Sequence, residues 1–244
     1  MFEKGGLLMI GCLCIHGFTG GPYELEPLVQ YLQKTTNWLI ATPCLPGHGR
    51  ELNLKGVTYD QWVKTAEEEL VKLIEACETV YVIGFSMGGV IAGYLATKYN
   101  IEKLVLLSAA VYYMNPKQML KDIQKMIVDS MKGKLRENAL FTRYKTKITS
   151  TPLSATLEFR KLVHLMRPKL KEICIPTLIA RGEKDGIVPI KSAYYLYKTI
   201  CSPVKKLLLL PSSGHLVCHG PGREQLFAEV EKFLKESVVV NRKG

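Results

Sequence analysis

The sequence predicts an α/β fold, a mostly parallel sheet flanked by helices with a small helical cap inserted between strands. Short runs rich in Val, Ile and Leu alternate along the chain with longer amphipathic stretches, as a parallel sheet with crossover helices requires. The chain has 244 residues, a length that one such domain can occupy. Hydrophobic residues make up 47% of the chain and charged residues 23%, the composition of an ordinary globular protein.

Six runs are expected to be strands, because their near-continuous apolar content suits strands buried on both faces. They are Leu8–Ile15, Trp38–Pro43, Thr79–Phe85, Lys103–Ser108, Pro176–Arg181 and Lys205–Leu210. The expected helices are Tyr23–Lys34, Tyr59–Ala76, Met87–Tyr99, Ile190–Ile200 and Arg223–Glu236. Thr58 is the expected N-cap of the second helix, since Gln61 three residues later completes a capping-box pattern.

One segment interrupts this alternation. Residues 111–172 contain helix-like stretches and no strand pattern, and they lie between the fourth and fifth expected strands. A helical insertion there would cover the edge of the sheet where ligands bind. We therefore expect residues 1–110 and 173–244 to form the core, with 111–172 as a helical cap within the same domain.

The net charge of +11 is concentrated in the same segment, which holds 14 lysines and arginines against 5 aspartates and glutamates. No nucleic-acid-binding motif accompanies this charge, so no nucleic-acid partner is expected. Two interpretations remain, a solvated basic surface or transient contact of the basic cap with an anionic membrane surface.

The cysteines and the N-terminus favour a cytoplasmic protein. The seven cysteines are odd in number, lie mostly in apolar runs and form no C-x-x-C pair, so they are expected to be reduced core residues rather than zinc ligands. We expect no secretory signal before the first strand, and no apolar run approaches the length of about 20 residues that spans a membrane.

The strongest chemical signal is Gly84-Phe85-Ser86-Met87-Gly88-Gly89. It follows an expected strand and opens an expected helix, and this context places a serine on the exposed apex of a sharp turn. Glycines two residues before and after Ser86 remove side chains that would clash in such a turn. The alternative is a glycine-rich strand–helix turn without chemistry. The context favours Ser86 as a nucleophile.

A nucleophilic serine needs a base, and in this arrangement the acid and then the histidine follow the serine in the chain. Of the four aspartates, only Asp185 follows both the serine and a strand, with Glu183 in the same loop as its competitor. His215 follows the last expected strand. The remaining histidines have weaker claims: His16, His48, His164 and His219.

The loop after the first strand supplies an expected oxyanion hole. Acyl transfer places negative charge on a carbonyl oxygen, which preorganised N–H groups stabilise. The N–H of Met87, directly after the nucleophile, is one expected donor. The glycines of His16-Gly17-Phe18-Thr19-Gly20-Gly21-Pro22 favour the N–H of Phe18 as the second. A plain glycine-rich turn is the alternative.

With these motifs the sequence resembles the bacterial carboxylesterase and monoacylglycerol lipase family of the α/β-hydrolase superfamily, from about Cys14 to Phe233. The motifs that support this resemblance are His16-Gly17-Phe18-Thr19-Gly20, Gly47-His48-Gly49, Gly84-Phe85-Ser86-Met87-Gly88-Gly89, Asp185 with Val188-Pro189, and Ser213-Gly214-His215. The resemblance implies the α/β-hydrolase fold, a catalytic triad of Ser86, Asp185 and His215, and an oxyanion hole formed by Phe18 and Met87. It implies no cofactor and no metal.

The resemblance also implies hydrolysis of short- to medium-chain acyl esters or monoacylglycerols, small-molecule ester or lipid substrates, through an acyl-enzyme intermediate. Thioesterase, lactonase or amidase activity would use the same triad and stays open, as does a non-hydrolytic ligand-binding homologue. The oligomeric state is not predicted.

Five of the eight methionines lie in the expected cap, and methionine suits adaptable apolar surfaces. Substrate contacts are therefore expected from Phe18 and Met87 and from the cap residues Met114, Met119, Met126 and Met166, with Met131 the fifth cap methionine. Ordinary helix packing is the alternative.

Overall fold

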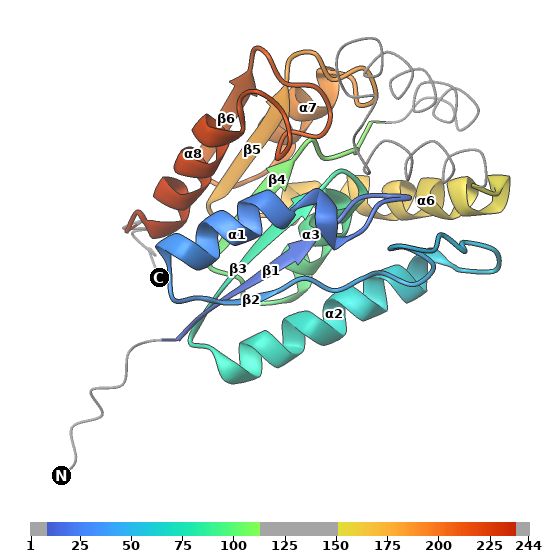
Figure 1. Ribbon diagram of the computed structural model, residues 1–244, viewed down its shortest axis with the longest axis horizontal. Helices are drawn as coiled ribbons and strands as arrows, with labels where there is room; N and C mark the ends of the chain where they lie inside the picture. The colour runs from blue at the N-terminus through green and yellow to red at the C-terminus, as the bar shows by residue number, and fades with distance from the viewer. Residues whose placement is uncertain (1–8, 113–150, 238–244) are drawn as a thin grey trace.

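The computed structural model describes residues 9–112 and 151–237 (Figure 1). Six strands form one sheet in the order β2-β1-β3-β4-β5-β6, and every neighbouring pair is parallel. Their bounds are β1 Ile10–Ile15, β2 Leu39–Ala41, β3 Thr79–Phe85, β4 Lys103–Leu107, β5 Thr177–Gly182 and β6 Lys205–Leu210. The predicted fold class is confirmed.

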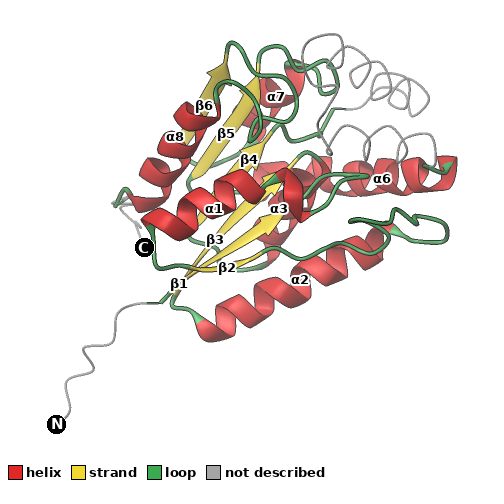
Figure 2. Cartoon of the chain, viewed as in Figure 1, coloured by secondary structure: helices red, strands yellow, loops and turns green. Residues whose placement is uncertain are grey.

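Helices cover both faces of this sheet (Figure 2). Their bounds are α1 Glu26–Thr35, α2 Tyr59–Ala76, α3 Met87–Lys98, α6 Leu153–Met166, α7 Lys191–Thr199 and α8 Arg223–Lys235, with short 3-10 helices η1 Pro22–Glu24 and η2 Arg167–Glu172. Side chains alternate along each strand. In β1, Cys12 and Cys14 therefore join the apolar cluster under α1 and α8, whereas Leu13 and Ile15 join the cluster under α2, α3, α6 and α7.

The predicted elements differ from the observed ones mainly at their ends. The first predicted helix is divided into η1 and α1, and β2 is three residues long. Helix α7 begins at Lys191, two residues after Pro189. The predicted N-cap of α2 is confirmed, since the backbone N–H of Thr58 donates to Gln61 Oε1 at 2.9 Å.

The described end of the predicted cap packs into the core. Helix α6 contacts α2 and α3, and its Ala155, Phe159, Leu162 and Met166 belong to the apolar cluster on that face of the sheet. The N–H of Tyr59 in α2 donates to Glu158 of α6 at 3.2 Å. Residues 113–150 lie outside the described residues, so the extent of the cap stays a prediction.

The cysteines follow the predicted pattern only in part. Cys12, Cys14, Cys77 and Cys218 are buried, while Cys44, Cys174 and Cys201 are exposed. Within residues 9–112 and 151–237, the structure has no helix long and apolar enough to cross a bilayer.

A buried lysine joins the sheet to the last helix. Lys103 begins β4 and is 2% exposed, and burial lowers its pKa. Its Nζ donates to the carbonyl oxygens of Phe233 at 2.8 Å and Leu234 at 3.0 Å, and to that of Glu236. These carbonyls end α8, where they have no partner within the helix and the dipole favours a cation.

We expect Lys103→Met to lower the free energy of unfolding by about 2 to 4 kcal/mol, because it leaves these carbonyls without their charged donor. For a domain of this size the melting temperature should fall by roughly 5 to 12 °C in a thermal denaturation scan. Lys72→Met, which removes an exposed pair with Glu69, is the matched control and should leave the melting temperature almost unchanged. Equal melting temperatures for the two variants would contradict this role.

Candidate active site

Ser86 lies at the sharp turn between β3 and α3. Its backbone has φ 53° and ψ −114°, a strained conformation for a residue with a side chain. Hydrogen bonds on both sides of the residue hold it there. Its N–H donates to Leu107 at 2.9 Å, and its carbonyl accepts from Gly89 at 3.1 Å and Ala110 at 3.2 Å.

The glycines around Ser86 are required by close approach of the backbone. A Cβ at Gly84 would lie 2.3 Å from the carbonyl oxygen of Gly88, and a Cβ at Gly88 would lie 2.1 Å from that of Ile15. Neither distance is possible for a side-chain carbon. The glycine spacing of the motif is therefore the steric condition for bringing β3, α3 and the end of β1 together.

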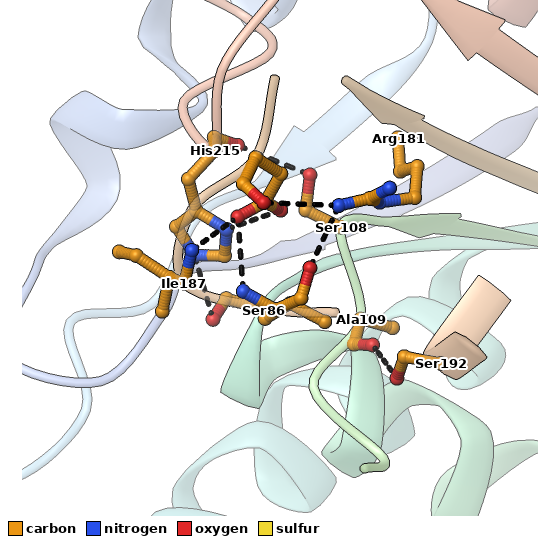
Figure 3. A network of polar contacts seen from close by, with 9 residues as sticks. Ser86, Ser108, Ala109, Arg181, Ile187, Ser192 and His215 are labelled. Carbon is orange, nitrogen blue, oxygen red and sulfur yellow. Dashed lines mark hydrogen bonds and ion pairs between the residues drawn. The ribbon is translucent and has the colours of Figure 1, made fainter. Parts of the chain in front are cut away.

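Three predicted residues, Ser86, Asp185 and His215, meet at the carboxyl edge of the sheet, and Figure 3 labels Ser86 and His215. His215 Nε2 lies 3.1 Å from Ser86 Oγ, and His215 Nδ1 lies 2.8 Å from Asp185 Oδ2. Ser86, Asp185 and His215 are each only 7–8% exposed. Glu183, the competing acid, is exposed and is not the carboxylate bonded to His215. The geometry permits proton transfer from the serine to a histidine oriented by the aspartate.

The environment of Asp185 stabilises its ionised form. Burial alone raises the pKa of this carboxyl, but His215 and two backbone donors outweigh burial, and the pKa lies below its ordinary value. The backbone donors are Ile187 at 2.8 Å and Val188 at 2.9 Å, both bonded to Oδ1. The two carboxylate oxygens therefore have different partners: Oδ1 binds the backbone of the loop after β5, and Oδ2 binds His215.

Three supporting residues were not predicted (Figure 3). Arg181, buried at the end of β5, donates from Nη2 to the carbonyls of Asp185 at 3.2 Å and Val188 at 2.7 Å. Ser108 Oγ donates to the carbonyl of His215 at 3.0 Å, and Ser192 Oγ donates to that of Ala109 at 2.9 Å. Their position at the carboxyl ends of β4 and β5, at the edge of the sheet that holds Ser86, Asp185 and His215, was the available signal for Ser108 and Arg181.

The predicted oxyanion loop is fixed by a buried histidine. His16 Nε2 accepts the N–H of Leu45 at 3.0 Å, so the ring proton lies on Nδ1, which donates to the carbonyl of Gly17 at 2.9 Å. In a trans peptide the carbonyl and the next N–H point in opposite directions. The N–H of Phe18 therefore points away from the His16 ring.

The residues predicted to contact the substrate are described by the structure only in part. The ring of Phe18 stacks on Phe159 of α6 at 5.4 Å and meets Trp62 of α2 edge-on at 5.8 Å. Met87 begins α3, whose first N–H groups have no partner within the helix, and its side chain is fully buried, as is that of Met166. Met114, Met119, Met126 and Met131 lie outside the described residues, and contact of any of these side chains with a substrate stays a prediction.

A serine, a histidine and an aspartate arranged in this way beside a parallel sheet are typical of the α/β-hydrolases. Residues 11–221 match the family described as serine aminopeptidase, S33. The chain is 30% identical over 223 residues to the thermostable monoacylglycerol lipase of Bacillus sp. (strain H-257), covering 85% of this chain and 83% of that protein. It is 23% identical over 236 residues to a carboxylesterase of Bacillus subtilis (strain 168), covering 96% and 94%.

A solved structure described for the metagenome-derived lipolytic enzymes LipS and LipT has the same fold. It superposes with a TM-score of 0.77 at 21% identity and covers 93% of this chain and 94% of that one. The chain belongs to the serine aminopeptidase S33 family of α/β-hydrolases, and it is a hydrolase.

Because the pKa of Asp185 is lowered in the folded protein, the free energy of unfolding depends on pH in the acid range. A carboxyl with a depressed pKa in the folded state contributes stability that is fully present above its unfolded pKa, about 3.9. This contribution is lost as the pH falls through the lower, folded value. We therefore expect the urea midpoint of the wild type to fall more steeply below about pH 4 than that of Asp185→Asn.

Asp60→Asn, which changes an exposed aspartate outside the site, is the control and should keep the acid profile of the wild type. If the urea midpoints of the wild type and Asp185→Asn fell in parallel between pH 6 and the acid limit of folding, the lowered pKa of Asp185 would be contradicted.

Proposed function

We propose that this hydrolase cleaves carboxylic esters, namely short- to medium-chain acyl esters or monoacylglycerols, through an acyl-enzyme formed on Ser86. The observation that carries the proposal is the continuous hydrogen-bonded path from Ser86 Oγ through His215 to Asp185, with distances of 3.1 and 2.8 Å. The names of the two Bacillus relatives, a monoacylglycerol lipase and a carboxylesterase, support an ester as the bond cleaved.

In the proposed reaction, His215 Nε2 removes the proton of Ser86 as Oγ attacks the ester carbonyl carbon. The tetrahedral intermediate collapses, and the same proton passes from His215 to the leaving alcohol. Water, deprotonated by His215, then releases the acid and restores the serine. Asp185 holds the proton of the histidine on Nδ1, which keeps Nε2 available as the base, and stabilises the imidazolium that forms.

The N–H groups of Phe18 and Met87 are the proposed oxyanion hole. Two observations support this pairing: Met87 directly follows Ser86, and the approach of Gly88 to Ile15 brings the start of α3 against the end of β1, where the Phe18 loop begins. The positive end of the α3 dipole adds to the stabilisation of the oxyanion. We further propose that the cap, residues 111–172, covers the acyl chain and that Met114, Met119, Met126 and Met166 contact it.

Hydrolysis of p-nitrophenyl esters of graded acyl length tests the proposal. We expect turnover by the wild type, and a loss of several orders of magnitude in kcat for Ser86→Ala, since the nucleophile and its base act as a unit. A fluorophosphonate probe should add its mass to Ser86 in the wild type and not in the variant. Turnover retained by a folded Ser86→Ala would overturn the nucleophile assignment.

The length profile tests the cap. A flat rate across acyl lengths would support an adaptable methionine-lined surface, and a single sharp optimum would contradict it. Thioesters and lactones belong in the same panel, because the acyl-enzyme chemistry is identical. Absence of turnover on the whole panel with retained ligand binding would instead indicate a non-hydrolytic homologue.

Amide hydrolysis is the second candidate, because the matching family is described as serine aminopeptidase. An amide nitrogen leaves only after protonation, which the proton held on His215 Nε2 would supply. Aminoacyl p-nitroanilides distinguish the two candidates: cleavage at rates near those of the best ester would favour the amidase.

The net charge of +9 in residues 111–172 is the reason to propose contact with anionic membrane surfaces. Cosedimentation should then show more protein bound to vesicles containing phosphatidylserine than to phosphatidylcholine vesicles, with the difference reduced by added salt. Equal binding to both would leave the basic segment as a solvated surface. A cytoplasmic location stays a prediction.

A further inference from the structure

A buried carboxylate lies directly beneath the proposed oxyanion loop. Glu24, the last residue of η1, is 4% exposed, and its Oε2 accepts the backbone N–H of Gly17 at 2.7 Å. A hydrogen bond of this length to a carboxylate belongs to the stronger class in proteins. Gly17 immediately precedes Phe18, so the carboxylate fixes the peptide unit next to the one that presents the proposed oxyanion donor.

The loop folds around this carboxylate. A Cβ at Gly20 would lie 2.0 to 2.3 Å from the three atoms of the Glu24 carboxyl group, so the Gly20 backbone rests on that group without a side chain between them. Thr19, between Phe18 and Gly20, has φ 61°, a conformation unusual for a residue with a side chain. Such a conformation persists only where the surroundings hold it. Glu24 supplies contacts on both sides of Thr19, at Gly17 and at Gly20.

The two peptide units around Gly17 are therefore fixed by different side chains. His16 Nδ1 bonds the Gly17 carbonyl, which belongs to the same peptide unit as the Phe18 N–H. Glu24 bonds the Gly17 N–H, which belongs to the preceding unit. Without Glu24, only the hydrogen bond from His16 to the Gly17 carbonyl holds this part of the loop. The φ and ψ angles of Gly17 can then vary, since glycine has no side chain to restrict them.

We propose that Glu24 is a positioning residue that orients the Phe18 N–H for stabilisation of the oxyanion. The inference rests on the proposed acyl-enzyme function. Glu24 does not touch the reacting atoms, so its effect should appear in the transition state and not in ground-state binding.

Kinetics of Glu24→Ala and Glu24→Gln on a p-nitrophenyl ester test the inference. Loss of the acceptor in Glu24→Ala should lower kcat roughly 10- to 100-fold, with KM within about twofold of the wild type. Glu24→Gln retains an oxygen that accepts the Gly17 N–H and should stay within about threefold in kcat. Affinity for a trifluoromethyl ketone, whose serine adduct carries an oxyanion, should fall in Glu24→Ala by the same factor as kcat.

Tyr31→Phe is the matched control. It removes a 2.6 Å hydrogen bond from Tyr31 of α1 to Glu231 of α8 and leaves the contacts of Glu24 with Gly17 and Gly20 in place, so it should leave kcat and inhibitor affinity unchanged. If Glu24→Ala does not fold, Glu24→Leu fills the same space without an acceptor and should show the same loss.

Hydrogen exchange of a peptide spanning residues 16 to 20 provides a readout that needs no turnover. Exchange should be faster in Glu24→Ala or Glu24→Leu than in the wild type and Tyr31→Phe. Wild-type exchange, or wild-type kcat and inhibitor affinity, in the folded variants would overturn the positioning role. A wild type without Ser86-dependent turnover would instead overturn the proposed function, and exchange would still decide the role of Glu24 in the loop.

Discussion

The approach of α3 to the end of β1 is the contact on which the site depends. A Cβ at Gly88 would lie 2.1 Å from the carbonyl oxygen of Ile15 and 2.5 Å from that of His16, so the helix packs directly on the backbone that begins the oxyanion loop. The same turn holds Ser86 at φ 53°. One steric fit thus joins the proposed nucleophile to the loop proposed to stabilise the oxyanion. Because protein interiors are densely packed, a small displacement of α3 would shift both the Ser86 turn and the loop that follows β1.

Burial of charge is the second constraint, and the site satisfies it with hydrogen bonds. An ionised carboxylate removed from water costs several kcal/mol unless donors replace the water. Asp185 receives donors from His215, Ile187 and Val188, and Arg181 binds the carbonyls at both ends of the same loop. The loop is consequently held at its carbonyls, its N–H groups and its side chain.

Most of the sheet and the three residues of the proposed triad were predicted from local patterns in the sequence. Buried parallel strands are nearly continuous apolar runs, and each of the three proposed triad residues follows a strand, so order and context narrowed the acid to the loop that holds Glu183 and Asp185. The hydrogen bond to His215 distinguishes Asp185 from Glu183. Glu24 could not be selected in this way. Its importance arises from its contact with Gly17 across a turn, and a glutamate after Pro22-Tyr23 has no local pattern that distinguishes it from an exposed one. Arg181 was missed for a similar reason, because an arginine ending a strand is usually solvated.

The three side chains of the site lie in the loops that follow three different strands of the sheet. Ser86 follows β3, Asp185 follows β5 and His215 follows β6, and the serine and the histidine are 129 positions apart in the sequence. No fragment that lacks β5 or β6 contains the complete set. Contacts this distant in sequence carry a loop-closure entropy that must be paid before they form. Assembly of the proposed site is therefore a property of the completed sheet, because Asp185 and His215 follow β5 and β6, the last two strands in the sheet order.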